Sequence, residues 1–210
     1  MTDIFALFDR ISSGSAAPAG AVTHLVVGLG NTGKPYEGTR HNAGFVCLDA
    51  VAEAAGARVT SLRFHALTAD ATYGGRRVLL MKPQTLMNLS GVAVAEAAGF
   101  YHIPPEHVIV LWDDINFALG HARIRLRGSH GGHNGLRDVT ARLGSENFVR
   151  IRVGVGQKPS PDYDLADWVL GHLPAGELAT LRDTVAPRMA DAVRLLLEGK
   201  PDLAMSQYSK

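Results

Sequence analysis

The stretch GLGNTGKPYEGTRHNAGF, residues Gly28–Phe45, lies between a short apolar run and the first long helical pattern of the chain. Its first six residues match G-x-G-x-x-G, a pattern that binds dinucleotides when a helix begins at the third glycine. Here the next credible helix begins only near Asn42, and the acidic residue at the expected separation, Asp49, falls inside that helix. We therefore reject a dinucleotide cofactor. The glycines are expected to bring the backbone close to a neighbouring element and to hold Asn31 between them.

Strand-like and helical segments alternate along the rest of the chain. Apolar or alternating runs predict strands at 24–29, on both sides of the turn at 73–75, and at 107–114, 122–128 and 148–156. Helical spacing occurs at 43–56, 88–101, 134–144 and 178–197, with a kink expected at Pro187. This alternation predicts an α/β fold, a single-domain layered structure with a mixed, twisted β-sheet flanked by helices. Residues 1–23 are expected to form an N-terminal extension, a short helix plus a flexible linker, ahead of the domain at 24–210.

Composition favours a soluble cytoplasmic protein. At 210 residues and 46% hydrophobic content the chain can bury one sizeable core, and its formal net charge is only +1. The single cysteine, Cys47, excludes an internal disulfide, suits a reducing compartment and lies in an apolar helical pattern typical of a core position. We expect no membrane span, because no apolar run approaches the roughly 20 residues needed. The N-terminus lacks the basic start of a secretory signal.

Polar residues at the ends of predicted elements form the candidate site. His41 lies at the mouth of a predicted helix, where the helix dipole favours a neutral, proton-accepting imidazole. Asp113 lies at the end of a buried strand, where open α/β sheets place their ligands. Asn88 and Asn134 lie at two further element ends, and the alternative for each is a simple helix cap. Together with Asn31, these residues are expected to line one cleft.

A basic cluster lies in the second half of the chain. The segment from His121 to Ser160 holds eight basic and two acidic residues, a local net charge of +6. Arg123 and Arg125 alternate along a predicted strand, so their side chains share one face. With Arg137 they are expected to contact phosphates. The alternative is an ordinary solvated surface, or an arginine that pairs with Asp138.

Several motifs, in this order, resemble bacterial peptidyl-tRNA hydrolase. They are GLGNTG with the following tyrosine and TRHNAGF, then KPQTLMNLSG, the aspartate pair after VLW, and GSHGGHNGLRD followed by RIRVGVG. The resemblance runs from about His24 to the C-terminal helix and leaves out residues 1–23. It implies an enzyme that cleaves the ester between a peptide and the 3′ end of tRNA, and so recycles peptidyl-tRNA that has dropped off or stalled on ribosomes. It also implies a monomer that uses no metal and no organic cofactor.

The same resemblance implies roles for individual residues. His41 would be the general base that deprotonates the attacking water, Asp113 would orient and stabilise its ring, and Asn31 would bind near the ester. Asn88 and Asn134 would hold the peptide backbone and the 3′ end, whose donors and acceptors an amide can match without charge. The set of residues expected to contact substrate or tRNA is completed by Tyr36, Leu86, Met87, His133, Arg123, Arg125 and Arg137.

Three positions depart from the family pattern. Thr32 replaces a proline in the glycine turn, which is expected to loosen that turn. Leu86 replaces an aromatic residue that would offer a stacking surface, and Asn116 replaces an acid near Asp113. Segment 163–174 resembles the family's mobile cover over the cleft.

Two other functions compete with this one. A metal-dependent hydrolase would use His130 and His133, but this H-x-x-H lies in a glycine-rich loop, unlike zinc pairs on helices or in cysteine frameworks. A catalytically inactive RNA-binding relative would lack the base or its acid, and the sequence holds both His41 and Asp113. We therefore expect an active enzyme without a metal.

Overall fold

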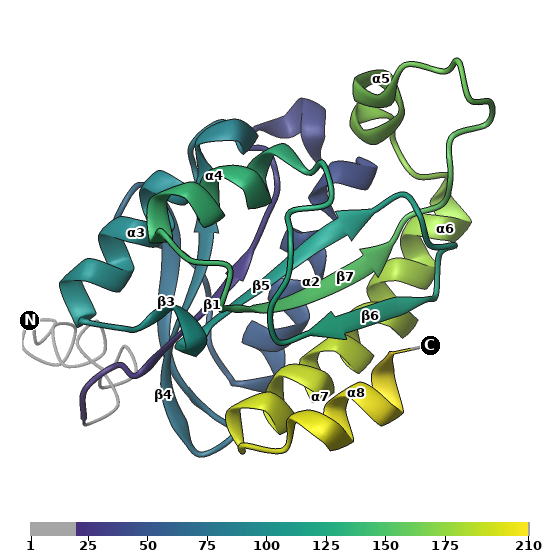
Figure 1. Cartoon of the computed structure of the whole chain (residues 1–210). Coiled ribbons are helices and arrows are strands. Elements are labelled where there is room, and N and C mark those ends of the chain that lie inside the picture. Colours follow the sequence, from purple (N-terminus) through teal and green to yellow (C-terminus); the bar gives the residue numbers. More distant parts are fainter. Residues whose placement is uncertain (1–19, 210) are drawn as a thin grey trace, which may run out of the picture.

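The computed structural model describes residues 20–209, and within them seven strands form one mixed sheet (Figure 1). The strand order is β2-β3-β4-β1-β5-β7-β6. The central strands run parallel, and they are β4 (Arg76–Pro83), β1 (His24–Gly28), β5 (Val108–Asp114) and β7 (Val149–Gly154). Antiparallel pairs join β3 (Ala66–Tyr73) to β4 and to β2 (Ser61–Arg63), and β6 (Ala122–Arg125) to β7. This confirms the predicted α/β fold. The predicted N-terminal helix lies outside the described residues.

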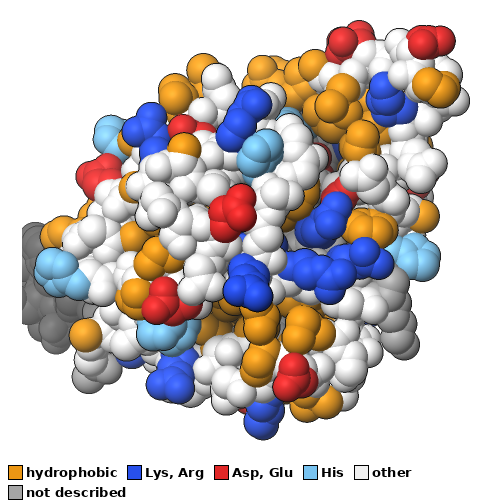
Figure 2. All heavy atoms as spheres, in the orientation of Figure 1, with side chains coloured by type: hydrophobic (Ala, Val, Ile, Leu, Met, Phe, Trp, Pro, Cys, Tyr) orange, Lys and Arg blue, Asp and Glu red, His pale blue; other side chains and the backbone are white. Residues whose placement is uncertain are grey.

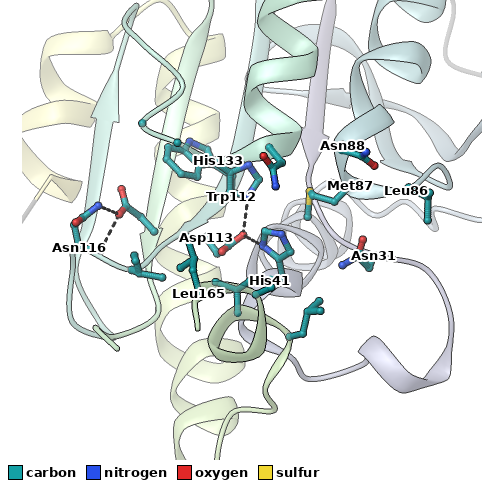
Figure 3. A pocket seen from close by; sticks show the side chains of 18 residues that line it. Asn31, His41, Leu86, Met87, Asn88, Trp112, Asp113, Asn116, His133 and Leu165 are labelled. Atoms are coloured by element: carbon teal, nitrogen blue, oxygen red, sulfur yellow. Dashed lines mark hydrogen bonds and ion pairs between the residues drawn. The ribbon is translucent and has the colours of Figure 1, made fainter. Parts of the chain in front are cut away.

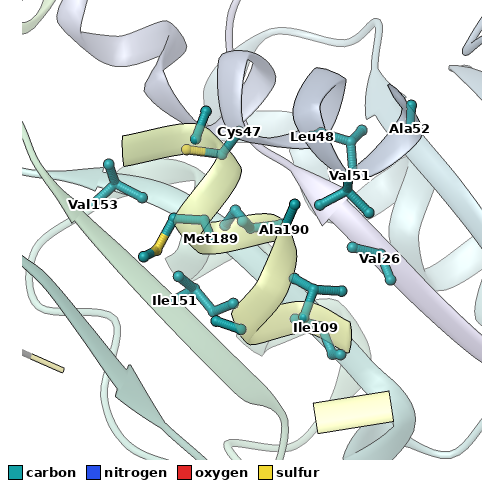
Figure 4. Packing of buried hydrophobic residues seen from close by; sticks show 14 of the residues in the cluster. Val26, Cys47, Leu48, Val51, Ala52, Ile109, Ile151, Val153, Met189 and Ala190 are labelled. Carbon is teal, nitrogen blue, oxygen red and sulfur yellow. The ribbon is translucent and has the colours of Figure 1, made fainter. Parts of the chain in front are cut away.

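Helices cover both faces of the sheet (Figure 1). One face carries α2 (Ala43–Ala54) and α7 (Ala186–Leu197), and the other carries α3 (Ser90–Tyr101) and α4 (Asn134–Leu143). The first face buries Cys47 of α2 beside Met189 and Ala190 of α7 (Figure 4). Burial raises the pKa of the Cys47 thiol to about 12, so this side chain serves the core, as predicted.

The glycines of the opening stretch let α2 approach the sheet. A Cβ on Gly44 would lie 2.4 Å from the carbonyl oxygen of Leu111 in β5 and 2.5 Å from that of Leu29. A Cβ on Gly28 would lie 2.4 Å from the carbonyl oxygen of Gly44. Because real Cβ atoms do not approach backbone this closely, only glycine allows the start of α2 to cross β1 and β5 here. The helix begins at Ala43, far beyond the third glycine of the fingerprint, which agrees with close packing as the use of the glycines.

The C-terminal helical region differs from the single helix predicted at 178–197. It consists of α6 (Ala175–Thr180), a π-helical turn η5 (Leu181–Val185) and α7. Proline has no N–H to bond a carbonyl four residues earlier, and the helix widens immediately before Pro187. A further helix, α8 (Pro201–Tyr208), packs against α7 and β6 and was not predicted.

Short turns complete the fold and place the site. They are the 3-10 turns η1 (Lys34–Tyr36), η2 (Arg40–Asn42), η3 (Met87–Leu89) and η4 (Pro105–His107), together with a short helix α5 (Leu165–Leu170). The carboxyl ends of β1 and β5 lie beside η2, η3 and the start of α4, so these segments meet at one end of the sheet. Among residues 20–209, no helix is long and apolar enough to cross a membrane.

Candidate active site

A cavity of about 650 Å³ opens at the carboxyl ends of β1 and β5 (Figure 3). Its lining includes eight of the residues predicted to act in catalysis or binding, namely Asn31, His41, Leu86, Met87, Asn88, Asp113, His133 and Asn134. The other four, Tyr36, Arg123, Arg125 and Arg137, lie elsewhere on the described part of the chain. The polar residues expected at one cleft therefore do meet there.

Asp113 joins two histidines at the centre of the cavity (Figure 3). Its Oδ1 lies 2.9 Å from Nδ1 of His41 and 3.0 Å from Nε2 of His133. The backbone N–H of Leu136 donates to Nδ1 of His133 at 3.1 Å, so in the neutral ring the proton of His133 is on Nε2 and points at the carboxylate. His41 donates from Nδ1 in the same way, and its Nε2 keeps a lone pair. This is the tautomer that a general base requires.

The charge of Asp113 controls the protonation of this group. Burial lowers the pKa of the His41 imidazole, but the charge of Asp113 and the hydrogen bond to it leave the pKa above its ordinary value of 6.5. Burial would raise the pKa of Asp113, and the two imidazoles hold it well below its usual range. The carboxylate therefore stays ionised. It also outweighs the helix-start effect, which had predicted a ring held in the neutral form.

Asn31 is held in place by a buried residue of the same stretch. Oδ1 of Asn42 accepts from the backbone N–H of Asn31 at 2.8 Å, and its Nδ2 donates to the Asn31 carbonyl at 3.0 Å. These two bonds anchor the backbone of Asn31, directly before the position where Thr32 replaces the family's proline. Asn42 was not predicted to act in the site. Its location directly after His41 in the TRHN motif was the available signal.

The two other asparagines are not helix caps. Asn88 lies inside η3, and Asn134 is the first residue of α4, whose cap is His133. Both side chains are exposed and face the cavity, and the guanidinium of Arg137 donates to Oδ1 of Asn134. The helix-cap alternative is therefore wrong for both residues. The amide of Asn88 and the Nδ2 group of Asn134 face the cavity without a hydrogen-bond partner among residues 20–209.

Asp114 uses its carboxylate to organise the loop after β5. The backbone N–H and the side chain of Asn116 donate to its Oδ1 at 2.9 and 2.8 Å (Figure 3). Arg152 forms an ion pair with Oδ2 of Asp114. Asn116 thus supports the neighbour of Asp113 by hydrogen bonding, where the family commonly has a charge.

Basic side chains gather on one face of the β6–β7 pair (Figure 2). Arg123 and Arg125 are exposed on that face, as predicted. Arg123 lies directly opposite Arg152 in the register of β6 and β7. Arg150 is different. It is 2% exposed, its guanidinium stacks on Phe148 at 3.8 Å, and it donates to the carbonyls of residues 146 and 148. Arg150 therefore serves the fold, and on β6 the exposed arginines are Arg123 and Arg125.

One group of residues has the composition of a metal site. The possible ligand atoms of His41, Asp113 and His133 lie within 4.8 Å of one another. Asp113 already forms a hydrogen bond with each histidine, and both ring nitrogens of His133 are engaged. His130, the other half of the H-x-x-H pair, accepts instead from the N–H of Gly132 at 3.1 Å. The arrangement suits proton transfer better than metal ligation, and the H-x-x-H pair does not converge.

An apolar wall lies beside the polar residues, and its helix falls within segment 163–174, which the resemblance predicted to cover the cleft. It is formed by Leu165, Val169 and Leu170 of α5, and Leu86, the residue directly before η3, adds a further apolar surface to the cavity. Leu86 is 68% exposed, so the position that is commonly aromatic in the family presents a smaller apolar surface here. The cavity thus combines amides and a histidine with an apolar side, a lining suited to a ligand with both characters.

Comparison with known proteins agrees with this geometry. The peptidyl-tRNA hydrolase family model matches residues 25–210. The peptidyl-tRNA hydrolase of Agathobacter rectalis is 46% identical over 187 residues, which cover 89% of this chain and 100% of that protein, and the one from a Thermoanaerobacter species is 43% identical over 186 residues, covering 89% and 99%. The crystal structure of the Acinetobacter baumannii peptidyl-tRNA hydrolase superposes with a TM-score of 0.82 at 35% identity and covers 91% of this chain and 97% of that one. This chain therefore belongs to the peptidyl-tRNA hydrolase family.

Proposed function

We propose that this protein hydrolyses the ester between the peptide and the 3′ end of tRNA in peptidyl-tRNA that has dropped off or stalled on ribosomes. Family membership and the named relatives support the reaction class. The observation that carries the mechanism is the 2.9 Å hydrogen bond between His41 and Asp113 in a cavity that also holds three asparagine amides. The proposal includes action in the cytoplasm, as a monomer and without a resident metal.

His41 acts as the general base in this proposal. Its Nε2 accepts a proton from a water molecule, whose oxygen attacks the carbonyl carbon of the ester. The tetrahedral intermediate then expels the ribose oxygen, which takes the proton back from the imidazolium. Asp113 stabilises the imidazolium without taking its proton. His133 acts through Asp113, because its Nε2 holds the same carboxylate oxygen.

The asparagines recognise the parts of the substrate that every peptidyl-tRNA shares. A peptide backbone offers the same donors and acceptors whatever its sequence, and an amide can match both without charge. Asn31 binds near the ester, and Asn88 and Asn134 hold the peptide backbone and the 3′ end. An amide N–H that donates to the developing oxyanion contributes about 3–4 kcal/mol in enzymes where this was measured.

The remaining predicted residues bind the substrate more peripherally. Leu86 and Met87 contact the substrate from the apolar side of the cavity. Arg123, Arg125, Arg137 and Tyr36 bind the acceptor stem, where cations neutralise phosphates without reading sequence.

The test is release of N-blocked aminoacyl groups from tRNA. We expect His41→Ala to lower kcat by about a hundredfold to ten-thousandfold, the range of a general base, with an unchanged melting temperature. His121→Ala, which removes an exposed histidine away from the cavity, is the matched control and should retain the wild-type rate. Equal rates for wild type and His41→Ala would refute the base. A wild type that binds tRNA but releases nothing would support the RNA-binding alternative.

A second test concerns the metal. Because both ring nitrogens of His133 are engaged in hydrogen bonds, we expect full activity after exhaustive chelation. Activity that is lost on chelation and restored by one divalent metal would show instead that His41, Asp113 and His133 act as ligands.

A further inference from the structure

The helix α5 forms a wall of the active-site cavity but stands apart from the body of the molecule (Figure 1). The described element that it packs against most is η2, the turn that carries His41. Leu165 and Leu170 are 48% and 38% exposed, and only Val169 of this helix is buried. A helix of six residues is too short to be stable by itself. Its position must therefore come from the contacts that hold it.

Arg40 supplies the side-chain part of those contacts. It directly precedes His41, is 7% exposed, and its guanidinium lies 3.5 Å from the centroid of the Trp168 ring on α5. Its NH1 group donates to the carbonyls of Gly171 and His172 at 3.3 and 3.2 Å, directly after the end of the helix. A cation stacked on indole and bonded to carbonyls at a helix C-terminus is favoured by both arrangements.

Backbone contacts join the same two segments. The N–H of Arg40 donates to the carbonyl of Gly171 at 3.1 Å, and the N–H of Leu173 donates to the carbonyl of Gly38 at 2.9 Å. At the other side of the ring, Nε1 of Trp168 donates to the carbonyl of Gly156 at 3.1 Å. The two backbone bonds fix residues 171–173 against residues 38–40. The position of α5 itself therefore depends on how Trp168 is held between Arg40 and Gly156.

We propose that Arg40 is a positioning residue that holds α5 at a fixed distance from the His41 base, so that its apolar side chains close the cavity. In Figure 3, Leu165 projects from α5 towards the cavity on the side of His41 away from Asn88. Segment 163–174 thus has one end tied to the catalytic turn. The inference rests on the proposed function for its kinetic consequence, whereas the tie itself is a property of the fold.

Arginine is specifically required for this role. Lysine keeps the charge but has a single nitrogen, so it cannot stack flat on the indole while donating to two carbonyls. Arg40→Lys and Trp168→Leu should therefore have the same effect, because both remove the stacking of Arg40 on Trp168. The double variant should change amide exchange and KM no more than the single variant with the larger effect. Arg182→Lys, in an exposed local pair with Asp183, is the matched control.

The experiment combines amide hydrogen exchange with kinetics on N-blocked aminoacyl-tRNA. In both single variants we expect the amides of residues 164–170 to exchange about tenfold faster or more. KM should rise about tenfold, because the wall contacts the substrate throughout the reaction. The pH midpoint of kcat should not move, because the His41–Asp113 pair is intact. That unchanged midpoint separates a displaced wall from a damaged base.

Three results would overturn the inference. One is a raised KM with unchanged exchange in α5, and another is faster exchange with wild-type kinetics. The third is wild-type exchange and wild-type kinetics in Arg40→Lys. If Arg40→Lys did not fold, Trp168→Leu would decide alone, because its site is on the peripheral helix. If the wild type released no aminoacyl groups, the proposed function would fail, and exchange would still decide whether Arg40 holds α5.

Discussion

Asp113 presents one carboxylate oxygen to two imidazole rings, and this sharing explains how a histidine beside it can serve as a base. The carboxylate is 2% exposed, and such burial is unfavourable unless the charge is hydrogen-bonded. His41 and His133 both supply N–H donors, and these hold the pKa of Asp113 well below its usual range. His133 is fixed in turn by the first turn of α4. The orientation of His41 therefore depends on a chain of contacts that reaches from β5 to α4.

Replacing this carboxylate should change both the rate and its pH dependence. We expect Asp113→Asn to lower the maximal kcat by about a hundredfold or more, because an amide does not stabilise the imidazolium and can favour the wrong tautomer. The base must be neutral, so kcat/KM rises with pH through the pKa of His41. Asp113 raises that pKa above 6.5, so its loss should move the midpoint to lower pH. The pH profile of kcat/KM measures both effects.

The matched control is Asp49→Asn, which removes an exposed carboxylate of α2 that pairs with Lys82. It should leave the midpoint and the maximal rate unchanged. A midpoint that stays in place or moves to higher pH in Asp113→Asn would show that the carboxylate does not set the protonation of His41.

At the residue scale, the sequence predicted those site residues that lie at the ends of helices and strands. His41, Asp113 and Asn31 could be predicted because the carboxyl ends of neighbouring parallel strands meet at one edge of a sheet. The link between His133 and Asp113 could not, because it joins residues twenty positions apart through the cap of α4. For His41 the sequence indicated two opposing effects, a helix start that favours the neutral ring and a carboxylate that stabilises the imidazolium, and in the structure the carboxylate dominates, because the pKa of His41 is raised.

Among the elements, the approach of α2 to the sheet positions His41, the proposed base. Gly44 lies where the helix crosses β1 and β5, one turn after His41. We expect Gly44→Ala to destabilise the fold by about 3 kcal/mol, because the new methyl group meets the backbone of β5 and of Leu29, directly after β1, and the helix must move outwards. Activity at a temperature where the variant is folded should fall about tenfold, because His41 moves with the helix. Denaturant unfolding and the release assay measure the two effects.

The control for this substitution is a glycine in another helix. Gly99 of α3 is exposed, and a Cβ there meets nothing within 4 Å. Gly99→Ala should stabilise the protein by about 0.5–1 kcal/mol, the usual gain for alanine in a helix. A similar loss of stability in both variants would mean that the cost at Gly44 is not a matter of space.

The long elements could be predicted from periodicity, whereas short ones could not. β5, α3 and α4 were recognised because apolar residues repeat over enough turns or alternations to be read. β2 has only three residues, which pair with the neighbouring strand β3, and α5 has six residues, whose position comes from Arg40, a partner distant in sequence. The helix α8 was missed because the prediction ended at the Gly199–Pro201 break, although a proline in the first turn is a helix start signal.

On the scale of the whole molecule, the charge is uneven although the total is only +1. The exposed arginines of β6 lie on the same face of the sheet as α3 and α4. These two helices do not cover that face at the β6–β7 edge, where the arginines are exposed (Figure 2). Arg152 of β7 is drawn towards Asp114, and Arg150 is buried against Phe148. The cationic surface available to a polyanion is therefore smaller than the sequence total of the segment, +6, indicates.

Salt dependence tests how much of this surface meets tRNA. Each phosphate contact releases counterions, so the logarithm of the affinity falls linearly with the logarithm of salt concentration, and each lost contact lowers the slope by about one. We expect Arg123→Gln with Arg125→Gln to reduce the slope of log KM against log salt by about two, while kcat at saturating substrate is retained. Arg58→Gln with Arg182→Gln removes the same charge from exposed positions elsewhere and should leave the slope unchanged. Equal slopes in the two double variants would mean that net charge alone, and not this face of the sheet, attracts the tRNA.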